Sequence, residues 1–110
     1  MKKISIVISV FNEESNIQEL VKEINKSKNP KFKYEIIFVN DGSSDASEDI
    51  IRNVCKADYE YKLLSFTKNY GHEMAMTAGM DISSGDAVIF MDADLQHPPH
   101  MIKEMVQIWE

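Results

Sequence analysis

The sequence has little cysteine and no long apolar run, and each shortage excludes a class of protein. The single cysteine, Cys55, cannot form an internal disulfide, and it lacks the paired Cys or His spacing that is typical of a zinc finger. The longest apolar run, Ala87 to Met91, is far shorter than the roughly 20 residues needed to cross a bilayer. We therefore expect neither a disulfide-stabilised secreted domain nor a membrane span, and a reducing, cytoplasmic compartment is the simpler expectation.

Basic charge is also scarce. Twelve Lys and Arg residues stand against eighteen Asp and Glu residues, which gives a formal net charge of -6. That sign argues against a protein that binds nucleic acid by neutralising its phosphates, whereas an acidic surface suits a divalent cation. The basic start Met1-Lys2-Lys3 is similar to a signal peptide, but Ser5 and Ser9 interrupt the stretch that follows, so we interpret it as a strand.

The length predicts one domain over residues 1–110. A chain of 110 residues, 44% of them hydrophobic, buries roughly two thirds of the surface that its unfolded form exposes. That is enough for one core and hardly for two. The composition is otherwise ordinary for a globular protein.

Short β-rich runs alternate with helical patterns along the chain. Ile4–Val10 and Tyr34–Val39 are nearly continuous apolar runs, typical of strands covered on both faces. A third strand, interrupted by Lys62 and Ser65, is predicted at Tyr61–Phe66, and a fourth apolar strand at Ala87–Met91. Four helices are predicted from apolar residues at helical spacing. The first contains Ile17, Leu20, Val21 and Ile24, and the second contains Ile50, Ile51 and Val54 after a capping box of Asp45 and Glu48. The third, within His72–Ser83, packs through Met76, Gly79 and Met80, and the fourth follows Pro98-Pro99 and contains Ile102, Met105, Val106 and Trp109.

The resulting order, β-α-β-α-β-α-β-α, predicts an α/β fold. Such an order gives a Rossmann-like parallel sheet with right-handed crossovers and helices on both faces. Ligands of these sheets bind at the carboxyl ends of the strands, near the point where the strand order reverses. Polar residues that follow the strands are therefore the candidates for a site.

Three polar clusters follow three of the predicted strands. They are Asn12 to Glu14, Asn40 to Ser43, and Asp92 to Gln96. Each cluster alone has an ordinary explanation, because Asn, Asp, Gly and Ser after a strand commonly form a turn or cap the next helix. Their expected convergence at one edge of the sheet favours a binding site.

The last cluster predicts a metal site. If the chain is still extended after the fourth strand, then Asp92, Asp94 and Gln96 point to the same side and offer three oxygen ligands. Mg²⁺ and Mn²⁺ prefer oxygen ligands and commonly leave coordination positions to substrate phosphates. A solvated acidic turn is the alternative interpretation. The glycine-rich fingerprints of dinucleotide-binding folds and of phosphate loops are absent.

Three stretches of the chain, in this order and spacing, resemble the N-terminal half of family-two glycosyltransferases of GT-A fold. They are SIVISVFNEESNI, YEIIFVNDGSSD and FTKNYGHEMAMTAGMDISSGDAVIFMDADLQHPP. The subgroup that they resemble most is the dolichyl- or undecaprenyl-phosphate sugar transferases. The resemblance covers nearly the whole chain, and it implies a domain that binds a nucleoside-diphosphate sugar.

The resemblance also implies roles for individual residues. It places the base and ribose at Val39 and Asp41, and it implies that Asp92 and Asp94 are the catalytic pair, holding Mg²⁺ or Mn²⁺ together with Gln96. In full, the implied nucleotide pocket consists of Ser9, Phe11, Glu13, Val39, Asp41, Asp92, Ala93 and Asp94. Two positions depart from the family. Ser9 stands where proline is usual, and Asn40 replaces the first of two acidic residues, so no charge-based role carries over to Asn40.

The implied reaction is the transfer of a sugar from a UDP- or GDP-sugar to an acceptor, with inversion at the anomeric carbon. The metal would bridge the diphosphate and stabilise the charge that grows on the leaving group. Lys68 and His72 are weaker candidates for extra positive charge there, because a loop lysine is commonly solvated and His72 could simply begin a helix. A polyprenyl-phosphate acceptor would supply its own oxyanion and would place the enzyme at the cytoplasmic face of the membrane.

Other interpretations stay open. Trp109 and Glu110 end the chain inside a predicted helix, which favours a donor-binding part of a longer enzyme that by itself binds nucleotide and transfers nothing. A receiver-like regulatory module would need an acceptor carboxylate after the third strand, where Phe66 to Asn69 has none. A hydrolase of the haloacid-dehalogenase kind would need its Asp-x-Asp motif after the first strand.

Overall fold

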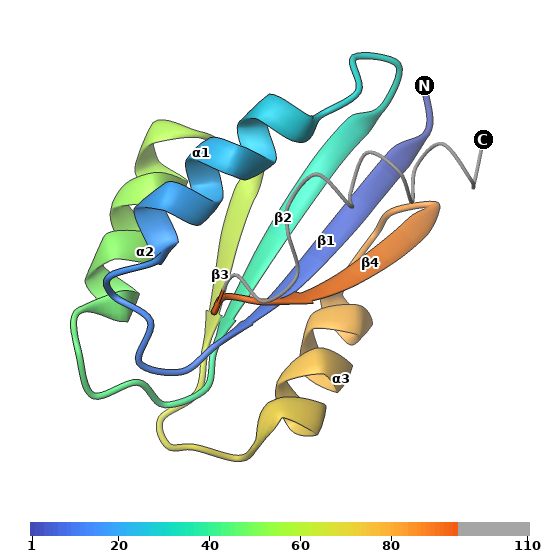
Figure 1. The fold of residues 1–110 in the computed structure, drawn as a ribbon. Coiled ribbons are helices and arrows are strands. Elements are labelled where there is room, and N and C mark those ends of the chain that lie inside the picture. Colours follow the sequence, from blue (N-terminus) through green and yellow to red (C-terminus); the bar gives the residue numbers. More distant parts are fainter. Residues whose placement is uncertain (95–110) are drawn as a thin grey trace.

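A computed structural model describes residues 1–94 as three layers, with a sheet between two layers of helices (Figure 1). Strands and helices alternate as the sequence predicts. In chain order they are β1 (Lys3–Val10), α1 (Ile17–Ser27), β2 (Lys33–Asn40), α2 (Ser47–Ala57), β3 (Tyr61–Ser65), α3 (His72–Ile82) and β4 (Ala87–Asp92). The helix predicted after Pro98 lies outside the described residues.

The four strands are parallel and lie in the order β3-β2-β1-β4. From β1 to β3 the chain moves outward one strand at a time, and α3 then carries it back past β1 so that β4 lies on the other side. Helices α1 and α2 cover one face of the sheet, and α3 covers the other (Figure 1). The predicted α/β fold with a parallel sheet is confirmed, and its strand order reverses between β1 and β4.

The two central strands, β1 and β2, form the middle of the core. All residues of Ile4–Val10 and of Tyr34–Asn40 are buried, as continuous apolar runs predict for strands covered on both faces. Successive side chains alternate between the two layers of helices. Ile6 packs in the cluster beneath α1 and α2, whereas Val7 packs beneath α3.

Helix α3 approaches the sheet closely at Gly79. A Cβ atom at this position would lie 2.3 Å from Val7 Cγ1 and 3.1 Å from Val39 Cγ2. Ala75 and Gly79 are buried, while Met80 is 48% exposed. The predicted packing of Gly79 and Met76 is confirmed, and that of Met80 is wrong. Ala75 and Gly79, two small residues one turn apart, bring the helix backbone down to the strands.

The start of α2 differs from the predicted capping box. Asp45 Oδ1 accepts a hydrogen bond from the backbone N–H of Ser47 at 2.9 Å, two residues along the chain. The Glu48 carboxylate turns instead toward the ends of β2 and β3, where it accepts hydrogen bonds from the Ser65 hydroxyl and the Asn40 amide. The capping box is replaced because the buried Asn40 amide and the half-buried Ser65 hydroxyl take the Glu48 carboxylate as their partner.

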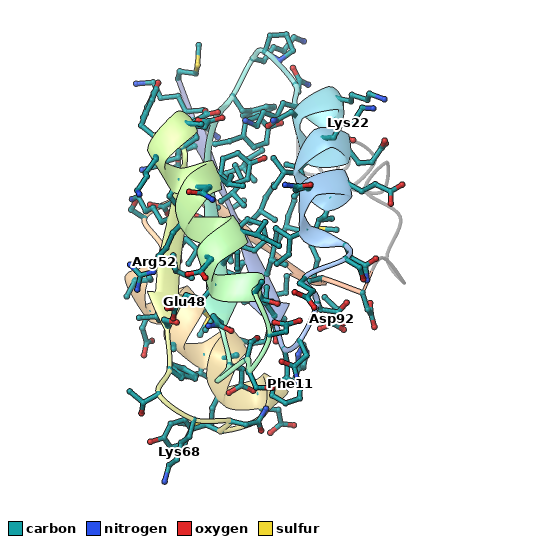
Figure 2. All side chains as sticks on the ribbon, turned by 90° about the vertical axis from the view of Figure 1, so that its left-hand side faces the viewer. Phe11, Lys22, Glu48, Arg52, Lys68 and Asp92 are labelled. Carbon is teal, nitrogen blue, oxygen red and sulfur yellow. The ribbon has the colours of Figure 1, made fainter. Side chains whose placement is uncertain are left out.

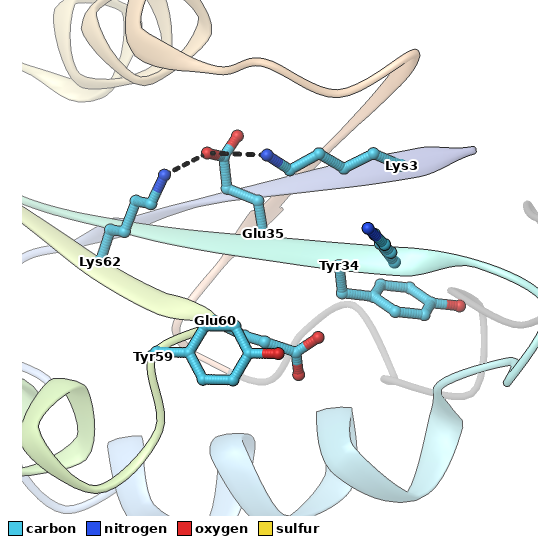
Figure 3. Close-up of a pocket in the computed structure, with 7 residues that line it drawn as sticks. Lys3, Tyr34, Glu35, Tyr59, Glu60 and Lys62 are labelled. Atoms are coloured by element: carbon cyan, nitrogen blue, oxygen red, sulfur yellow. Dashed lines mark hydrogen bonds and ion pairs between the residues drawn. The ribbon is translucent and has the colours of Figure 1, made fainter. Parts of the chain in front are cut away.

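A buried carboxylate lies at the amino edge of the sheet (Figure 3). Glu35 is 1% exposed and accepts hydrogen bonds from Ser5 Oγ at 2.7 Å, Ser84 N–H at 2.9 Å and Lys62 Nζ at 2.5 Å, with Lys3 Nζ 3.8 Å away. Burial alone would raise the pKa of Glu35, but the hydrogen bonds from Lys62, Ser84 and Ser5 outweigh it and lower the pKa to about 2. This network ties three strands to the turn before β4.

The Glu35 network predicts a specific dependence of stability on pH. Because the pKa of Glu35 is about 2 in the folded chain and ordinarily 4.5, its contribution is complete above pH 4.5 and is lost as the pH falls toward 2. That contribution is about 3 kcal/mol. Urea unfolding of wild type and Glu35→Gln should give a difference in free energy that shrinks over this range. Glu19→Gln, at an exposed site, is the control, and a difference that stays constant with pH would contradict the prediction.

The close approach at Gly79 gives a second prediction. Gly79→Val should lower the free energy of unfolding by about 1–3 kcal/mol, because the added methyl groups overlap Val7. Urea denaturation measures the change. Met80→Val places the same side chain on the exposed neighbouring position, and its effect should stay within about 0.5 kcal/mol. Equal losses in the two variants would show that α3 does not pack tightly on the sheet.

Candidate functional site

The polar clusters that follow β1, β2 and β4 meet at the carboxyl edge of the sheet. Figure 2 shows Phe11 and Asp92 toward the same end of the molecule, with Lys68 at the tip of that end. Ser9 on β1 pairs with Asp92 on β4, and the Ala93 N–H donates to the Ser9 carbonyl at 3.1 Å. The site therefore lies where the strand order reverses, which is the position that parallel sheets use for ligands.

A cavity of about 440 Å³ lies at this edge. Seven of the eight residues predicted for the nucleotide pocket line it, together with three residues of the loop and helix start after β3. The lining consists of Ser9, Phe11, Glu13, Asp41, Asn69, Gly71, His72, Asp92, Ala93 and Asp94. The structure thus brings together side chains from four separate parts of the chain.

Two other candidates lie outside the cavity, and a third is not described. Val39 is fully buried in the core beneath α3 and does not line the cavity. Lys68 lies in the loop after β3, with its Nζ 5.2 Å from the centre of the Tyr70 ring, and it does not line the cavity either. Gln96, the predicted third metal ligand, lies outside the described residues.

The loops after β1 and β2 are held together by reciprocal hydrogen bonds. Asn12 adopts a left-handed backbone conformation, with φ of 52°, which short polar side chains tolerate. Its Oδ1 accepts from the Ser44 N–H at 2.8 Å, and its own N–H donates to Ser43 Oγ at 2.9 Å. The Glu13 N–H donates to Ser47 Oγ at 2.9 Å, at the start of α2. The position of Glu13 in the cavity thus depends on the loop after β2.

Asp41 anchors the loop that follows β3. Its carboxylate is 2% exposed, and it accepts hydrogen bonds from the Tyr70 N–H at 2.7 Å and the Gly71 N–H at 3.0 Å. Asn69 Nδ2 donates to the Asp41 carbonyl at 3.2 Å. Both carboxylate oxygens of Asp41 therefore accept from backbone N–H groups. Each oxygen has a second lone pair, which can accept a hydrogen bond from a hydroxyl group.

Gly42 allows the same two loops to touch. A Cβ atom here would lie 2.3 Å from the carbonyl carbon of Lys68 and 2.4 Å from the backbone nitrogen of Asn69. Its φ of 71° also favours glycine. Sequence analysis assigned Asp41 and Gly42 to a turn but missed Asn69 and Gly71 as lining residues. The signal available for these two was the glycine of Asn69-Tyr70-Gly71 just before a helix.

The cavity is acidic. Glu13, Asp41, Asp92 and Asp94 are among its lining residues, and no lysine or arginine of residues 1–94 lines it. The ring of His72 lies against one of these carboxylates, with Nδ1 3.0 Å from Asp92 Oδ1. A diphosphate would meet repulsion in this cavity unless a cation entered with it.

The oxygen ligands that the described residues offer at this site fit Mg²⁺ or Mn²⁺ in part. Asp92 and Asp94 offer hard carboxylate oxygens, which both ions prefer. Within residues 1–94, no three His, Cys, Asp or Glu side chains gather closely enough to hold a metal by themselves. Two carboxylates with open positions suit an ion that keeps several ligands from water and phosphate.

Comparison with known proteins identifies the family. The family model described as glycosyl transferase family 2 matches residues 5–110, which is nearly the whole chain. The chain belongs to this family. A bactoprenol glucosyl transferase of Shigella phage SfV is 45% identical over 109 residues, a match that covers 98% of the chain and 36% of that protein.

Two solved structures of glycosyltransferases have the same fold. A mannosyltransferase from Pyrobaculum calidifontis, in complex with GDP-Man and Mn²⁺, superimposes with a TM-score of 0.83 at 21% identity, covering 96% of this chain and 32% of that one. Glucosyl-3-phosphoglycerate synthase from Mycobacterium tuberculosis, in complex with Mn²⁺, UDP and glucosyl-3-phosphoglycerate, gives 0.76 at 26% identity, covering 98% and 39%. The present chain of 110 residues spans about a third of the length of the curated relatives that it matches.

The anchoring of the loop by Asp41 can be tested. Asp41→Asn replaces one accepting oxygen with an NH₂ group that faces a backbone N–H, so the free energy of unfolding should fall by about 1–3 kcal/mol. Amide hydrogen exchange at Tyr70 and Gly71 should become faster. Asp49→Asn, on the exposed side of α2, is the matched control. Unchanged exchange at Tyr70 and Gly71 in the Asp41 variant would show that the carboxylate does not hold the loop.

Proposed function

We propose that residues 1–110 form the donor-binding part of a metal-dependent, inverting glycosyltransferase that takes its sugar from a nucleoside-diphosphate sugar. The observation that carries this proposal is the cavity at the switch point, where residues from the ends of β1 and β4, the residue after β2 and the start of α3 converge. Membership of glycosyltransferase family 2 supports the reaction class. UDP- and GDP-sugars are the expected donors, because the two similar solved enzymes are in complex with UDP or GDP-Man.

The proposed cofactor is Mg²⁺ or Mn²⁺, held by Asp92 and Asp94, with Gln96 as a third ligand. The Mycobacterium tuberculosis synthase, 26% identical to this chain, is in complex with Mn²⁺ and UDP, which supports a divalent ion at such a site. A bound ion would neutralise the diphosphate and stabilise charge on the leaving group. Asp92 and Asp94 orient the diphosphate end of the donor, and Ser9, Phe11, Glu13 and Asp41 border its nucleoside end.

The proposed acceptor is a polyprenyl phosphate at the cytoplasmic face of the membrane. The name of the Shigella phage relative, a bactoprenol glucosyl transferase, supports this class of acceptor. A phosphate oxyanion attacks without giving up a proton, so the acceptor would need no general base from the chain. Within residues 1–94, none of the helices is long and apolar enough to cross a bilayer.

A receiver-like module is disfavoured by the end of β3. That strand ends at Ser65, and Phe66, Thr67 and Lys68 follow, so a phosphoacceptor carboxylate does not stand there. The remaining alternative, a chain that binds the donor and transfers nothing, shares the donor site described above. Such a chain would bind the nucleoside-diphosphate sugar as the proposed enzyme does, but it would not transfer the sugar.

Donor binding tests the proposal directly. Calorimetric titration of the folded chain with UDP-glucose and GDP-mannose, each with Mn²⁺ or with EDTA, should show binding of at least one donor that depends on the metal. Asp94→Asn should weaken the metal-dependent binding about tenfold or more, because a coordinating carboxylate is lost. Asp81→Asn, on the exposed side of α3, should bind as wild type does. Folded protein that binds neither donor with Mn²⁺ would refute the proposed function.

A further inference from the structure

We propose that His72 is a positioning residue for Asp92, which it holds in the orientation that binds the divalent cation. This inference rests on the proposed function, because it deepens the description of the same site. It assigns His72 a role different from direct contact with the diphosphate. The observation behind it is the close contact between the His72 ring and the Asp92 carboxylate, with Nδ1 3.0 Å from Oδ1.

The contact joins one ring nitrogen to one carboxylate oxygen. His72 Nδ1 lies 3.0 Å from Asp92 Oδ1. A carboxylate oxygen accepts only, so the proposed role requires a proton on Nδ1 of the imidazole. The two side chains are 51% and 33% exposed, which means that water competes for the bond. Its value for the site is therefore orientation more than stability.

The backbone of His72 is fixed from two sides. His72 is the first residue of α3, and the two residues before it, Tyr70 and Gly71, donate their N–H groups to the buried Asp41 carboxylate. The first turn of the helix closes through the Ala75 N–H, which donates to the Gly71 carbonyl at 3.1 Å. The imidazole thus projects from a rigid start of a helix that packs closely on the sheet.

Asp92 has a fixed backbone and a side chain that needs a partner. It pairs with Ser9 as the last residue of β4. Its χ1 and χ2 angles are not set by that pairing. Glu13, Asp41 and Asp94 line the same cavity and add negative charge to it. The contact with His72 would restrict the rotation of the Asp92 carboxylate before a cation arrives.

Outer ligands of this kind affect metal affinity. Carboxylates that bind a metal are commonly held by a second hydrogen-bonded group, and removal of that group typically lowers metal affinity 10–100-fold. His72→Ala removes the donor. His72→Asn keeps it, because the Asn amide nitrogen occupies nearly the position of Nδ1. The pair of variants therefore separates a lost hydrogen bond from a general disturbance of the helix start.

The experiment is a titration of Mn²⁺, followed by electron paramagnetic resonance of the free ion, in the presence of saturating UDP. His72→Ala should weaken Mn²⁺ binding about tenfold or more, and His72→Asn should restore most of the loss. Met74→Ala, an exposed residue of the same helix turn, should bind as wild type does. In the metal-free wild type, ¹⁵N chemical shifts of the His72 ring should report the Nδ1–H tautomer.

The outcomes separate this inference from the proposed function. Wild type that binds no Mn²⁺ would refute the metal-dependent function and this role with it. Wild type that binds Mn²⁺ as tightly as His72→Ala would refute the role of His72 alone, as would an Nε2–H tautomer in the metal-free protein. Loss of metal-free UDP binding in His72→Ala, without rescue by His72→Asn, would assign His72 to the diphosphate instead.

Discussion

The candidate site depends on one buried carboxylate that binds backbone. Asp41 directly follows β2 and accepts hydrogen bonds from two successive N–H groups of the loop after β3, and in doing so it sets where α3 begins. The start of α3 in turn carries His72 to the end of β4. Without Asp41 the strand ends would still share one edge of the sheet, but the loop between β3 and α3 would have no fixed place beside them.

The fold was predictable because its signals are local and repeated. Continuous apolar runs indicate the two central strands, and the alternation of strands and helices indicates a parallel sheet, which the structure confirms. The predictions of the capping box and of the packed face of α3 failed where a local sequence pattern competes with a contact between distant residues. Glu48 fits a capping box by spacing, yet buried strand-end groups take its carboxylate. Met80 fits a helix stripe, yet Ala75 and Gly79 make the contact because small side chains permit a closer approach.

The lining of the candidate cavity was largely predictable from the sequence, but the contacts that each lining side chain makes were not. Parallel strands bring their carboxyl ends together, so the clusters after three strands had to converge, and seven of the eight predicted pocket residues line one cavity. The hydrophobic period and the spacing of residues along the chain do not show which carboxylate points toward a ligand and which one binds backbone N–H groups. Asp41 and Asp92 look alike in the sequence, but one binds two N–H groups and the other an imidazole. Those assignments depend on contacts between residues about 20 to 30 positions apart.

In the part of the chain that the structure describes, negative charge is paired with lysines at the amino edge of the sheet but not at the carboxyl edge. At the amino edge, Glu35 receives Lys62 and Lys3 as partners and is fully compensated by the chain itself (Figure 3). At the carboxyl edge, four carboxylates share a cavity that no lysine or arginine of residues 1–94 lines. The carboxyl edge therefore keeps negative charge that no lysine or arginine lining the cavity within residues 1–94 offsets, and a cation that bound there only in the folded state would also stabilise the fold. Ligand occupancy and folding stability would then be coupled at that edge.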